Sequence, residues 1–193
     1  MAGGVFAAVG SRASVDLGIE SAELMIAIRP YTSADVIFAR QHLNGPDAGH
    51  AVWFGYSSPR LQAEFDANGL LSPDGGRLIV DQDGEAVGSV QWGKDSWGPA
   101  GLSWCWEIGI LLRKDARGRG IGTEAQALLR DYLFNHTRAE RLQAVTDVEN
   151  IAEQRALEKA GFLREGRVRS AQWRAGRWHD QYLYACVRSD WER

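Results

Sequence analysis

The sequence predicts one mixed α/β domain in which strands and helices alternate. Short apolar runs are followed by helical patterns, and turn residues separate the two. The length of 193 residues corresponds to a single domain that can bury a sizeable core. Residues 1–23 are rich in Gly, Ala and Ser and show no sustained period. We therefore expect a poorly patterned N-terminal extension over residues 1–23 and a domain over residues 24–193.

The chain between residues 24 and 69 predicts one strand and two helices. The apolar run 24–29 is typical of a strand, and the proline that follows ends it. A Thr-Ser pair can then cap a helix that reaches residue 43. A Ser-Pro pair opens a second, short helix, and Gly69 stands just past its end.

The middle of the chain predicts three strands. Strands over residues 77–82 and 85–92 flank an Asp-Gly pair, which is a strong hairpin signal. After a loop rich in Gly, Trp and Pro, the apolar run 103–112 forms the third strand. Its two tryptophans, Trp104 and Trp106, share one face of the strand, and we expect them to pack under a helix.

The last third predicts two helices and a closing hairpin. The first helix has apolar residues at helical spacing: Ala125, Leu128, Leu129, Tyr132 and Leu133. A strand over 142–146 leads to a helix over 151–160, which a glycine ends. From Phe162 onward we expect a hairpin with a long Arg-rich turn and a last strand over 182–187.

Composition argues against several classes of protein. The net charge of −3 and the pI of about 5.8 give no overall attraction to nucleic acid or to an anionic membrane, so neither is an expected partner. Cys105 and Cys186 lie far apart, and no two histidines have metal-binding spacing, so we expect no disulfide framework and no metal. No apolar run reaches the roughly 20 residues of a membrane helix. We expect a cytoplasmic protein.

A basic, glycine-rich loop stands between the third strand and the next helix. Residues 113–122 carry four basic side chains against one acidic one. Glycines let successive backbone N–H groups converge, and the following helix adds the positive end of its dipole, so the loop suits a phosphate group. It lacks the Gly-Lys-Ser/Thr triplet of a P-loop, and Thr123 stands where the dinucleotide pattern needs its last glycine.

The remaining pattern, Arg-x-x-Gly-x-Gly over residues 117–122, resembles the acetyl-CoA pyrophosphate loop of the GNAT superfamily of N-acetyltransferases. The resemblance covers residues 24–191 and looks most like the RimJ/RimL-like branch. It extends to these further segments: Glu107-Ile108-Gly109, Thr123-Glu124-Ala125, Asn150, Leu157–Phe162 and His179-Asp180. It implies a GNAT-type fold, with a mixed, mostly antiparallel central sheet flanked by helices.

The resemblance also implies acetyl-CoA as co-substrate, without a metal or a covalent enzyme intermediate. Backbone N–H groups of the loop would bind the pyrophosphate: Arg117, Gly118, Arg119, Gly120, Ile121 and Gly122, with Thr123 at the helix start. A strand that separates from its neighbour would pair with the pantetheine arm through Ile110, Leu111 and Leu112. Asn150 would lie near that arm on the other side of the opening, and it also fits a capping box with Glu153.

Glu107 is the candidate proton acceptor for an amine. It is a lone carboxylate in an apolar strand, close to where the thioester would lie, and burial would raise its pKa toward neutrality. The alternative is an edge-facing Glu paired with an arginine. A backbone N–H near Ile110 would stabilise the oxyanion. Tyr182 and Tyr184 are weak candidates for the general acid, because packing explains both, and His179 needs no catalytic explanation.

The resemblance implies an N-acetyltransferase that acylates a primary amine. The acceptor would be a protein N-terminus or a small molecule such as an aminoglycoside or a polyamine, and family grounds suggest a homodimer. Four acidic residues could attract a cationic acceptor or simply belong to the surface: Glu64, Asp66, Asp74 and Asp95. Two alternatives stay open, an acyl-CoA-binding sensor or scaffold without turnover and a nucleotide-phosphate binder that uses the same loop.

Overall fold

The computed structural model describes residues 9–13, 24–43, 60–99 and 101–193. Its strands are β1 (Val9–Ala13), β2 (Leu24–Arg29), β3 (Leu71–Ser72), β4 (Gly75–Gln82), β5 (Glu85–Ser96), β6 (Trp104–Leu112), β7 (Arg141–Asp147), β8 (Leu163–Arg174) and β9 (Arg177–Val187). Its helices are α1 (Ser33–His42), α2 (Leu61–Asn68), the 3-10 turn η2 (Lys114–Ala116), α3 (Ile121–His136), α4 (Ile151–Lys159) and α5 (Arg188–Trp191).

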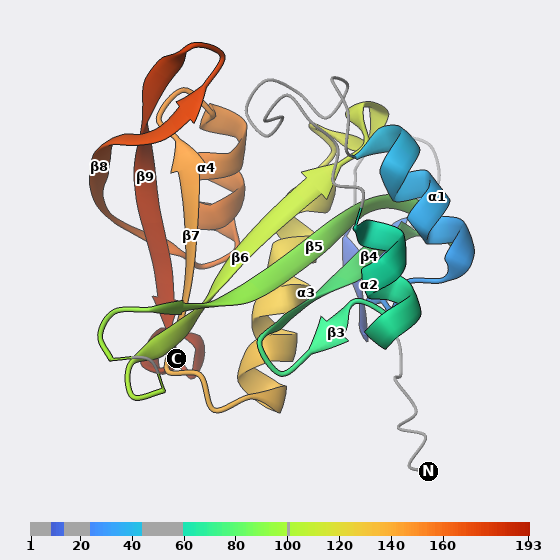
Figure 1. Cartoon of the computed structure of the whole chain (residues 1–193), viewed down its shortest axis with the longest axis horizontal. Helices are drawn as coiled ribbons and strands as arrows, with labels where there is room; N and C mark the ends of the chain where they lie inside the picture. Colours follow the sequence, from blue (N-terminus) through green and yellow to red (C-terminus); the bar gives the residue numbers. More distant parts are fainter. Residues whose placement is uncertain (1–8, 14–23, 44–59, 100) are drawn as a thin grey trace.

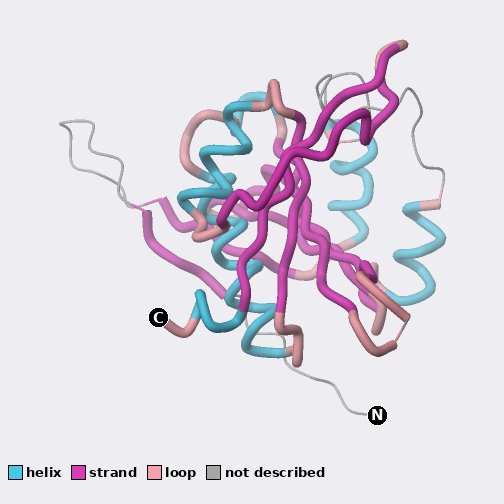
Figure 2. Tube along the Cα trace, turned by 90° about the vertical axis from the view of Figure 1, so that its left-hand side faces the viewer, coloured by secondary structure: helices cyan, strands magenta, loops and turns pink. Residues whose placement is uncertain are grey.

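The strands form one open sheet in the order β1-β2-β4-β5-β6-β7-β9-β8, with β3 paired to β4. Among the described pairs, only β6 and β7 run parallel. Helices α3 and α4 cover one face of the sheet, whereas α1 and α2 cover part of the other face (Figures 1 and 2). The predicted mixed, mostly antiparallel sheet flanked by helices is confirmed.

The larger core lies between the sheet and helices α3 and α4. Trp106, Leu129 and Phe162 are buried there, and Trp106 donates a hydrogen bond from Nε1 to Thr137 Oγ1 at 3.2 Å. Trp104 packs edge-on against Trp106. The prediction that both tryptophans pack under a helix is therefore confirmed, and Glu107 consequently points to the opposite face of the sheet.

A smaller core lies under α1 and α2. Val36 and Leu61 contribute to it from the helices, and Ile79 contributes from β4. Leu78 and Val80, on either side of Ile79, face the larger core instead. Burial on both faces makes the centre of β4 a continuous apolar run, which explains why residues 77–82 were recognisable as a strand.

The β4–β5 hairpin has the predicted turn. Asp83 has φ 54° and Gly84 has φ 89°, so both central residues adopt the left-handed conformation that a tight two-residue hairpin requires. Strand β5 runs to Ser96, four residues beyond the predicted end at residue 92. Its last residues pair with the start of β6, although they are exposed.

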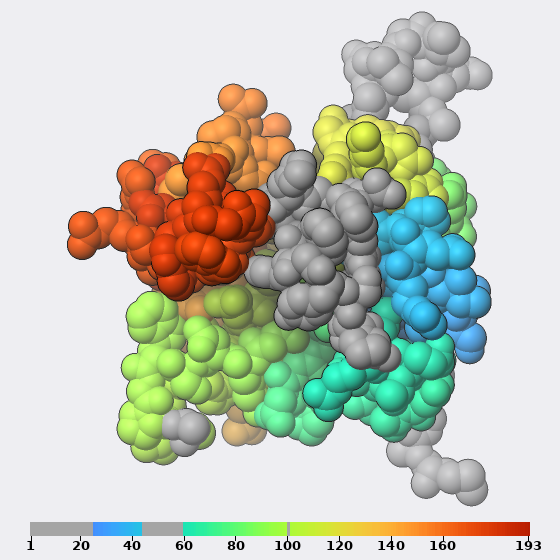
Figure 3. Space-filling view, turned by 45° about the horizontal axis from the view of Figure 1, so that its top comes forward, coloured from blue at the N-terminus to red at the C-terminus, as the bar shows by residue number. Residues whose placement is uncertain are grey.

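The predicted long Arg-rich turn near the C-terminus is wrong. Strands β8 and β9 are long, and only Ala175 and Gly176 separate them, both at positive φ. Nearly all of β8 is exposed, so it carries no apolar alternation that would reveal a strand. The resulting hairpin projects from the sheet (Figure 2) and stands, in red, on the far side of the molecule from α1, in blue (Figure 3).

Part of the predicted N-terminal extension is a strand. β1 pairs antiparallel with β2 along its whole length, from Val9↔Ile28 to Ala13↔Leu24. The other residues of segment 1–23 lie outside the described residues, so its role as an extension stays a prediction. No helix of the described part is long and apolar enough to span a membrane.

Candidate functional site

The two parallel strands separate from each other. β6 and β7 are paired at Trp106↔Leu142 and Glu107↔Gln143, yet β6 continues to Leu112. Figure 1 shows the strands diverging beyond that point. We call the resulting gap the β6–β7 opening. Its β6 side carries the three residues predicted to pair with a pantetheine arm: Ile110, Leu111 and Leu112.

The glycine-rich loop lies at the wide end of the β6–β7 opening, because it follows β6 directly. Gly118 and Gly120 have φ of 73° and 82°, which favour glycine, and Gly120 is the N-cap of α3. No side chain of the described residues caps α3, so within this part of the chain the first N–H groups of the helix have no capping partner. The predicted loop residues from Arg117 to Thr123 therefore come together as one turn with the positive end of a helix dipole.

The basic side chains of this loop differ in their surroundings. Arg113 pairs with Glu85 and Asp115, so its charge is compensated within the protein. The side chain of Arg117 bends back, and its Nε donates to the carbonyl of Leu112 at 3.0 Å. Arg119 is exposed beside the loop. Backbone N–H groups, rather than one dedicated lysine, are thus the main hydrogen-bond donors that this loop offers.

The start of α4 forms the other side of the opening. Asn150 is the N-cap, and its side chain accepts a hydrogen bond from the backbone N–H of Glu153 at 3.4 Å. The reciprocal half of the predicted capping box is missing, since the N–H of Asn150 donates to the carbonyl of Asp147 at 2.9 Å. The Glu153 side chain contacts Gln126 of α3 instead, and burial raises the pKa of Glu153 to about 7.

Glu107 lies where the two strands begin to separate. Its carboxylate accepts a hydrogen bond at 3.0 Å from Nε2 of Gln143, which also donates to Asp95 at 2.7 Å. The side-chain oxygen of Gln143, Oε1, accepts a hydrogen bond from the indole N–H of Trp97 at 2.9 Å. The hydrogen-bond partner of Glu107 is therefore an amide, not the arginine of the alternative interpretation. Glu107 itself is half-buried.

A cavity of about 570 Å³ opens beside this network. We call it the Glu107 cavity; α2, β4, β5 and β6 line it. Glu64, Asp95 and Glu107 give its wall three carboxylates. Two basic residues, Arg77 and Lys94, also line the cavity, and Lys94 pairs with Asp74 at 2.8 Å. Carboxylates outnumber basic side chains in the wall, which favours a cationic ligand.

The two tyrosines considered as proton donors have structural partners. Tyr184 is fully buried, and its hydroxyl donates to Glu158 at 3.0 Å. Burial and the neighbouring Glu158 raise the pKa of Tyr184 to about 12, which makes the phenol a poor acid near neutrality. The ring of Tyr182 lies under the guanidinium of Arg164 at 4.7 Å.

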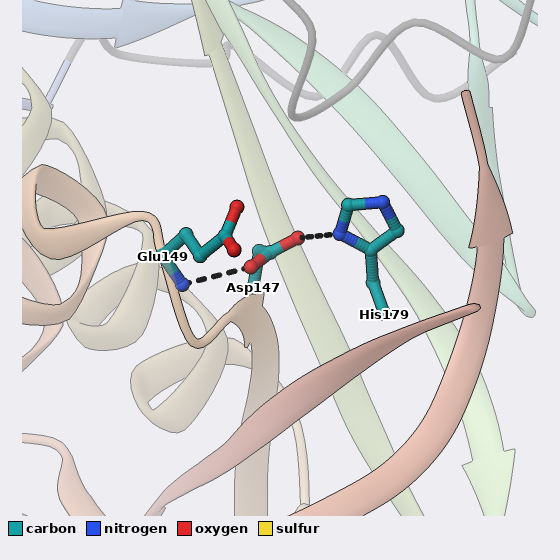
Figure 4. A group of neighbouring side chains, drawn as sticks. All are labelled: Asp147, Glu149 and His179. Atoms are coloured by element: carbon teal, nitrogen blue, oxygen red, sulfur yellow. Dashed lines mark hydrogen bonds and ion pairs between the residues drawn. The ribbon is translucent and has the colours of Figure 1, made fainter. Parts of the chain in front are cut away.

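The structure adds a polar cluster that the sequence did not predict. His179 of β9 lies 2.8 Å through Nδ1 from Oδ2 of Asp147, at the end of β7, and Arg174 of β8 contacts both. Figure 4 shows the ring turned so that its second nitrogen points away from Asp147. That atom, Nε2, is buried and has no hydrogen-bond partner among the described residues. An unsatisfied buried group of this kind costs about 1–3 kcal/mol.

This cluster does not fit a metal ion. Asp147, Glu149 and His179 each offer an atom within 4.8 Å of the others. The guanidinium of Arg174, however, already lies against Asp147 Oδ2 and His179 Nδ1, where a cation would need to be. Arg174 would repel a metal ion at that place, and it already neutralises the negative charge of Asp147.

The chain has relatives of known family. Residues 26–163 match the acetyltransferase (GNAT) domain. Probable N-acetyltransferase YjcK of Bacillus subtilis is 38% identical over 86 residues, which are 45% of this chain and 48% of that protein. For Uncharacterized N-acetyltransferase YnaD of the same organism the identity is 29% over 86 residues, 45% and 51% of the two chains. This chain thus spans about half the length of the curated relatives it matches.

Solved structures share the fold. A spermidine N-acetyltransferase from Vibrio cholerae, in complex with CoA and spermine, has a TM-score of 0.74 at 18% identity and covers 87% of this chain and 98% of its own. The RimL ribosomal α-N-protein acetyltransferase, in complex with coenzyme A, has a TM-score of 0.71 at 18% identity, with 84% and 93% covered. These similarities in fold are consistent with the family match, which covers most of the sheet, including the β6–β7 opening and the glycine-rich loop. The chain belongs to the acetyltransferase (GNAT) domain family.

Proposed function

We propose that this protein is an N-acetyltransferase that transfers the acetyl group of acetyl-CoA directly to a primary amine. One observation carries the proposal: the β6–β7 opening has an uncapped helix N-terminus at its wide end and a carboxylate-lined cavity at its closed end. The first feature suits a pyrophosphate and the second suits an ammonium group. Family membership and the names of the relatives support the same reaction.

Acetyl-CoA would bind through backbone groups. The N–H groups from Gly118 to Thr123 would hold the pyrophosphate, since both the loop conformation and the helix dipole favour an anion there. The pantetheine arm would lie in the opening and pair with β6 between Ile110 and Leu112. Asn150 would approach it from the start of α4, where the side-chain N–H₂ is not used by the helix cap.

The amine would enter through the Glu107 cavity. An alkylammonium group has a pKa of about 10, so it must lose a proton before it can attack a thioester. Glu107 is the proposed acceptor, directly or through a water molecule, while a backbone N–H near Ile110 stabilises the oxyanion. Glu64 and Asp95 would hold the positive charge of the incoming acceptor.

The acceptor class follows from this wall. Three carboxylates against the two basic side chains Arg77 and Lys94 favour a cationic amine, either a small molecule such as a polyamine or an aminoglycoside, or a protein N-terminus. One structural neighbour is a spermidine N-acetyltransferase and another acts on a ribosomal protein N-terminus, so the fold accommodates both kinds. Resemblance to the family also supports a homodimer and a cytoplasmic location, and light scattering after size-exclusion chromatography tests the former.

The substitution Glu107→Gln tests the proposal. It keeps the side-chain shape but removes the proton acceptor, so kcat for thiol release with a panel of amines should fall by about 10²-fold or more. Calorimetry should give the wild-type Kd for acetyl-CoA, because the loop is unchanged. Glu140→Gln, the same chemical change at an exposed position before β7, is the matched control and should behave as wild type.

Two outcomes would contradict the proposal. Binding of acetyl-CoA without thiol release for any amine would favour the alternative, an acyl-CoA sensor or scaffold without turnover. Binding of ATP as tight as that of acetyl-CoA would favour a nucleotide-phosphate binder.

A further inference from the structure

His179 holds a proton on one ring nitrogen and presents a lone pair on the other. Asp147 can only accept, so its 2.8 Å contact favours a hydrogen on Nδ1 of His179, and this contact is shorter than the 3.1 Å contact of the same atom with Nη2 of Arg174. Arg174 can only donate, and its contact with the same carboxylate favours the ionised form of Asp147. In a neutral ring of this tautomer the lone pair is on Nε2, which is the buried side-chain atom without a partner in the described part of the chain.

The strand pattern places His179 on the same face of the sheet as Glu107. Gln143 and Asp147 are four residues apart on β7, so they share a face. Gln143 bonds Glu107 across the closed end of the opening, and Asp147 bonds His179 farther along. Val145 lies between them on β7, and its side chain is 44% exposed, so the face between the two groups is open.

Asp147, the partner of His179, also lies at about the height of the proposed thioester position. From the last β6–β7 pair, Ile110 is three residues onward along β6 and Asp147 is four residues onward along β7. At about 3.3 Å per residue these points are about 10 and 13 Å from the closed end, on opposite sides of the opening. Asp147, which holds the imidazole, therefore lies across the opening from the segment proposed to bind the reacting carbonyl.

The reaction leaves a proton transfer without an assigned residue. An ammonium nitrogen loses two protons in becoming an amide nitrogen. The first leaves before attack and goes to Glu107. The second leaves after the C–N bond has formed, and the thiolate released when the C–S bond breaks gains one proton. Nitrogen and sulfur are attached to the same carbon at that stage, so one imidazole can reach both, as the histidine of a serine protease does.

We propose that His179 is a second catalytic residue, which accepts the proton of the attacking nitrogen at Nε2 and donates it to the sulfur of the leaving coenzyme A. This inference rests on the proposed function. The ring begins and ends the cycle neutral, so no further reactant is needed. Asp147 and Arg174 are positioning residues, because they fix the tautomer and the orientation of the ring.

Several polar and charged groups surround the ring. Asp147 on β7 and Arg174 on β8 contact it directly. Glu149 lies within the same cluster, just after β7. Gln172 is the cross-strand partner of His179 and contacts Arg174 as well as Gln181. The His179 ring thus lies next to one anion, Asp147, and one cation, Arg174, and hydrogen bonds hold both in place.

The first test is the substitution His179→Gln, whose amide can still donate to Asp147. We expect kcat to fall by about 10²- to 10⁴-fold and Kd for acetyl-CoA to stay unchanged. The wild-type kcat should also decline on acidification, because a protonated imidazole cannot accept a further proton, and this acid limb should disappear in the variant. His136→Gln, at the exposed end of α3, is the matched control and should keep the wild-type profile.

A second arm separates the two proton transfers. With amines of low pKa the defect of Glu107→Gln should shrink, because little ammonium remains to be deprotonated, whereas the defect of His179→Gln should persist. A wild-type kcat in His179→Gln, or a reduced kcat with the acid limb retained, would overturn the inference. If the wild-type protein acetylates no amine, the proposed function itself fails.

A measurement on the unaltered protein avoids any folding defect of the variant. Long-range proton–nitrogen correlation spectra distinguish the two neutral tautomers of a histidine. We expect His179 to carry its proton on Nδ1. A proton on Nε2 would overturn the inference, since that nitrogen could then not accept another.

Discussion

At the scale of single residues, two carboxylates near the β6–β7 opening are held in opposite ways. Burial raises the pKa of Glu153 to about 7, and the contact with Gln126 offsets this only in part. Burial also disfavours the charge of Asp147, but there the hydrogen bonds from the Glu149 N–H, Arg174 and His179 outweigh it and lower the pKa. The same loss of water thus leaves one group close to neutral and keeps the other ionised.

The raised pKa of Glu153 predicts a pH-dependent stability. The unfolded value is near 4.5, so below that pH the group is protonated in both states and contributes nothing. Between that value and the folded pKa of about 7 the unfolded chain ionises while the folded protein keeps the proton, so the free energy of unfolding falls across this range and stays lower above it. Glu153→Gln, a neutral isostere, should therefore raise the free energy of unfolding at about pH 8 by up to about 3 kcal/mol and leave it unchanged at about pH 4.

Urea denaturation of both proteins at the two pH values measures this difference. Glu140→Gln, at an exposed position, is the control and should show no pH-dependent difference from wild type. Equal stabilities of Glu153→Gln and wild type at the higher pH would contradict the prediction.

At the scale of secondary-structure elements, the turn before α3 sets the direction of the N–H groups that follow. Gly120→Val introduces a β-branched residue at φ 82°, although nothing lies within 4 Å of its Cβ. The cost is therefore backbone strain of about 1–2 kcal/mol, and the turn should shift to relieve it. We expect calorimetry to show loss of acetyl-CoA binding.

Gly84→Val is the matched control for that experiment. Gly84 has φ 89°, lies in the β4–β5 turn, and likewise has no atom within 4 Å of the place that a Cβ would occupy. The variant should lose a similar amount of stability and keep acetyl-CoA binding. Equal loss of binding in both variants would mean that strain alone, and not the loop, explains the result.

Elements with a local signal could be predicted from the sequence. The glycine loop and α3 were recognisable because their turn residues and helical period lie within 20 contiguous positions, 117–136. Strand β8 escaped because water covers nearly all of it, which removes the apolar alternation. Strand β1 escaped because it is a five-residue segment without a sustained period, and it is recognisable only by its pairing with β2.

At the scale of the whole molecule, the C-terminal residues fasten the end of α3. Arg188 donates hydrogen bonds to the carbonyls of Phe134, Thr137 and Ala139 at distances from 2.8 to 3.1 Å. Trp191 stacks on Phe134 and donates to Asp131 at 2.8 Å. A residue far along the chain thus satisfies carbonyls at and just beyond the end of the helix, which the helix itself leaves without partners.

Arg188→Ala should therefore destabilise the protein without affecting its site. Hydrogen bonds to a charged group contribute about 1.5–3 kcal/mol, and we expect a loss of that order in the free energy of unfolding. Thermal and denaturant unfolding measure it, while Kd for acetyl-CoA should not change. Arg193→Ala is the control, because that side chain is largely exposed, and a similar loss there would contradict the assignment.

The cluster around His179 shows what a sequence leaves undetermined. Asp147, Arg174 and His179 come from three strands, and only the sheet order β7-β9-β8 makes them neighbours. Their spacing along the chain matches no local period. Glu107 was recognisable because a single carboxylate interrupted an apolar run, but its bond to Gln143 depends on the parallel pairing of two distant strands.

Because β6 and β7 are paired at only two positions, backbone hydrogen-bonding groups beyond those positions have no partner in the neighbouring strand. A co-substrate that hydrogen-bonds to the unpaired edges of these strands would take the place of a strand. Its binding would therefore be coupled to the stability of the sheet. At a free concentration about 100 times its Kd, such a ligand adds about 2.7 kcal/mol to the free energy of unfolding. The thermal resistance of the protein, and its resistance to proteolysis, should thereby follow the acetyl-CoA level of its surroundings.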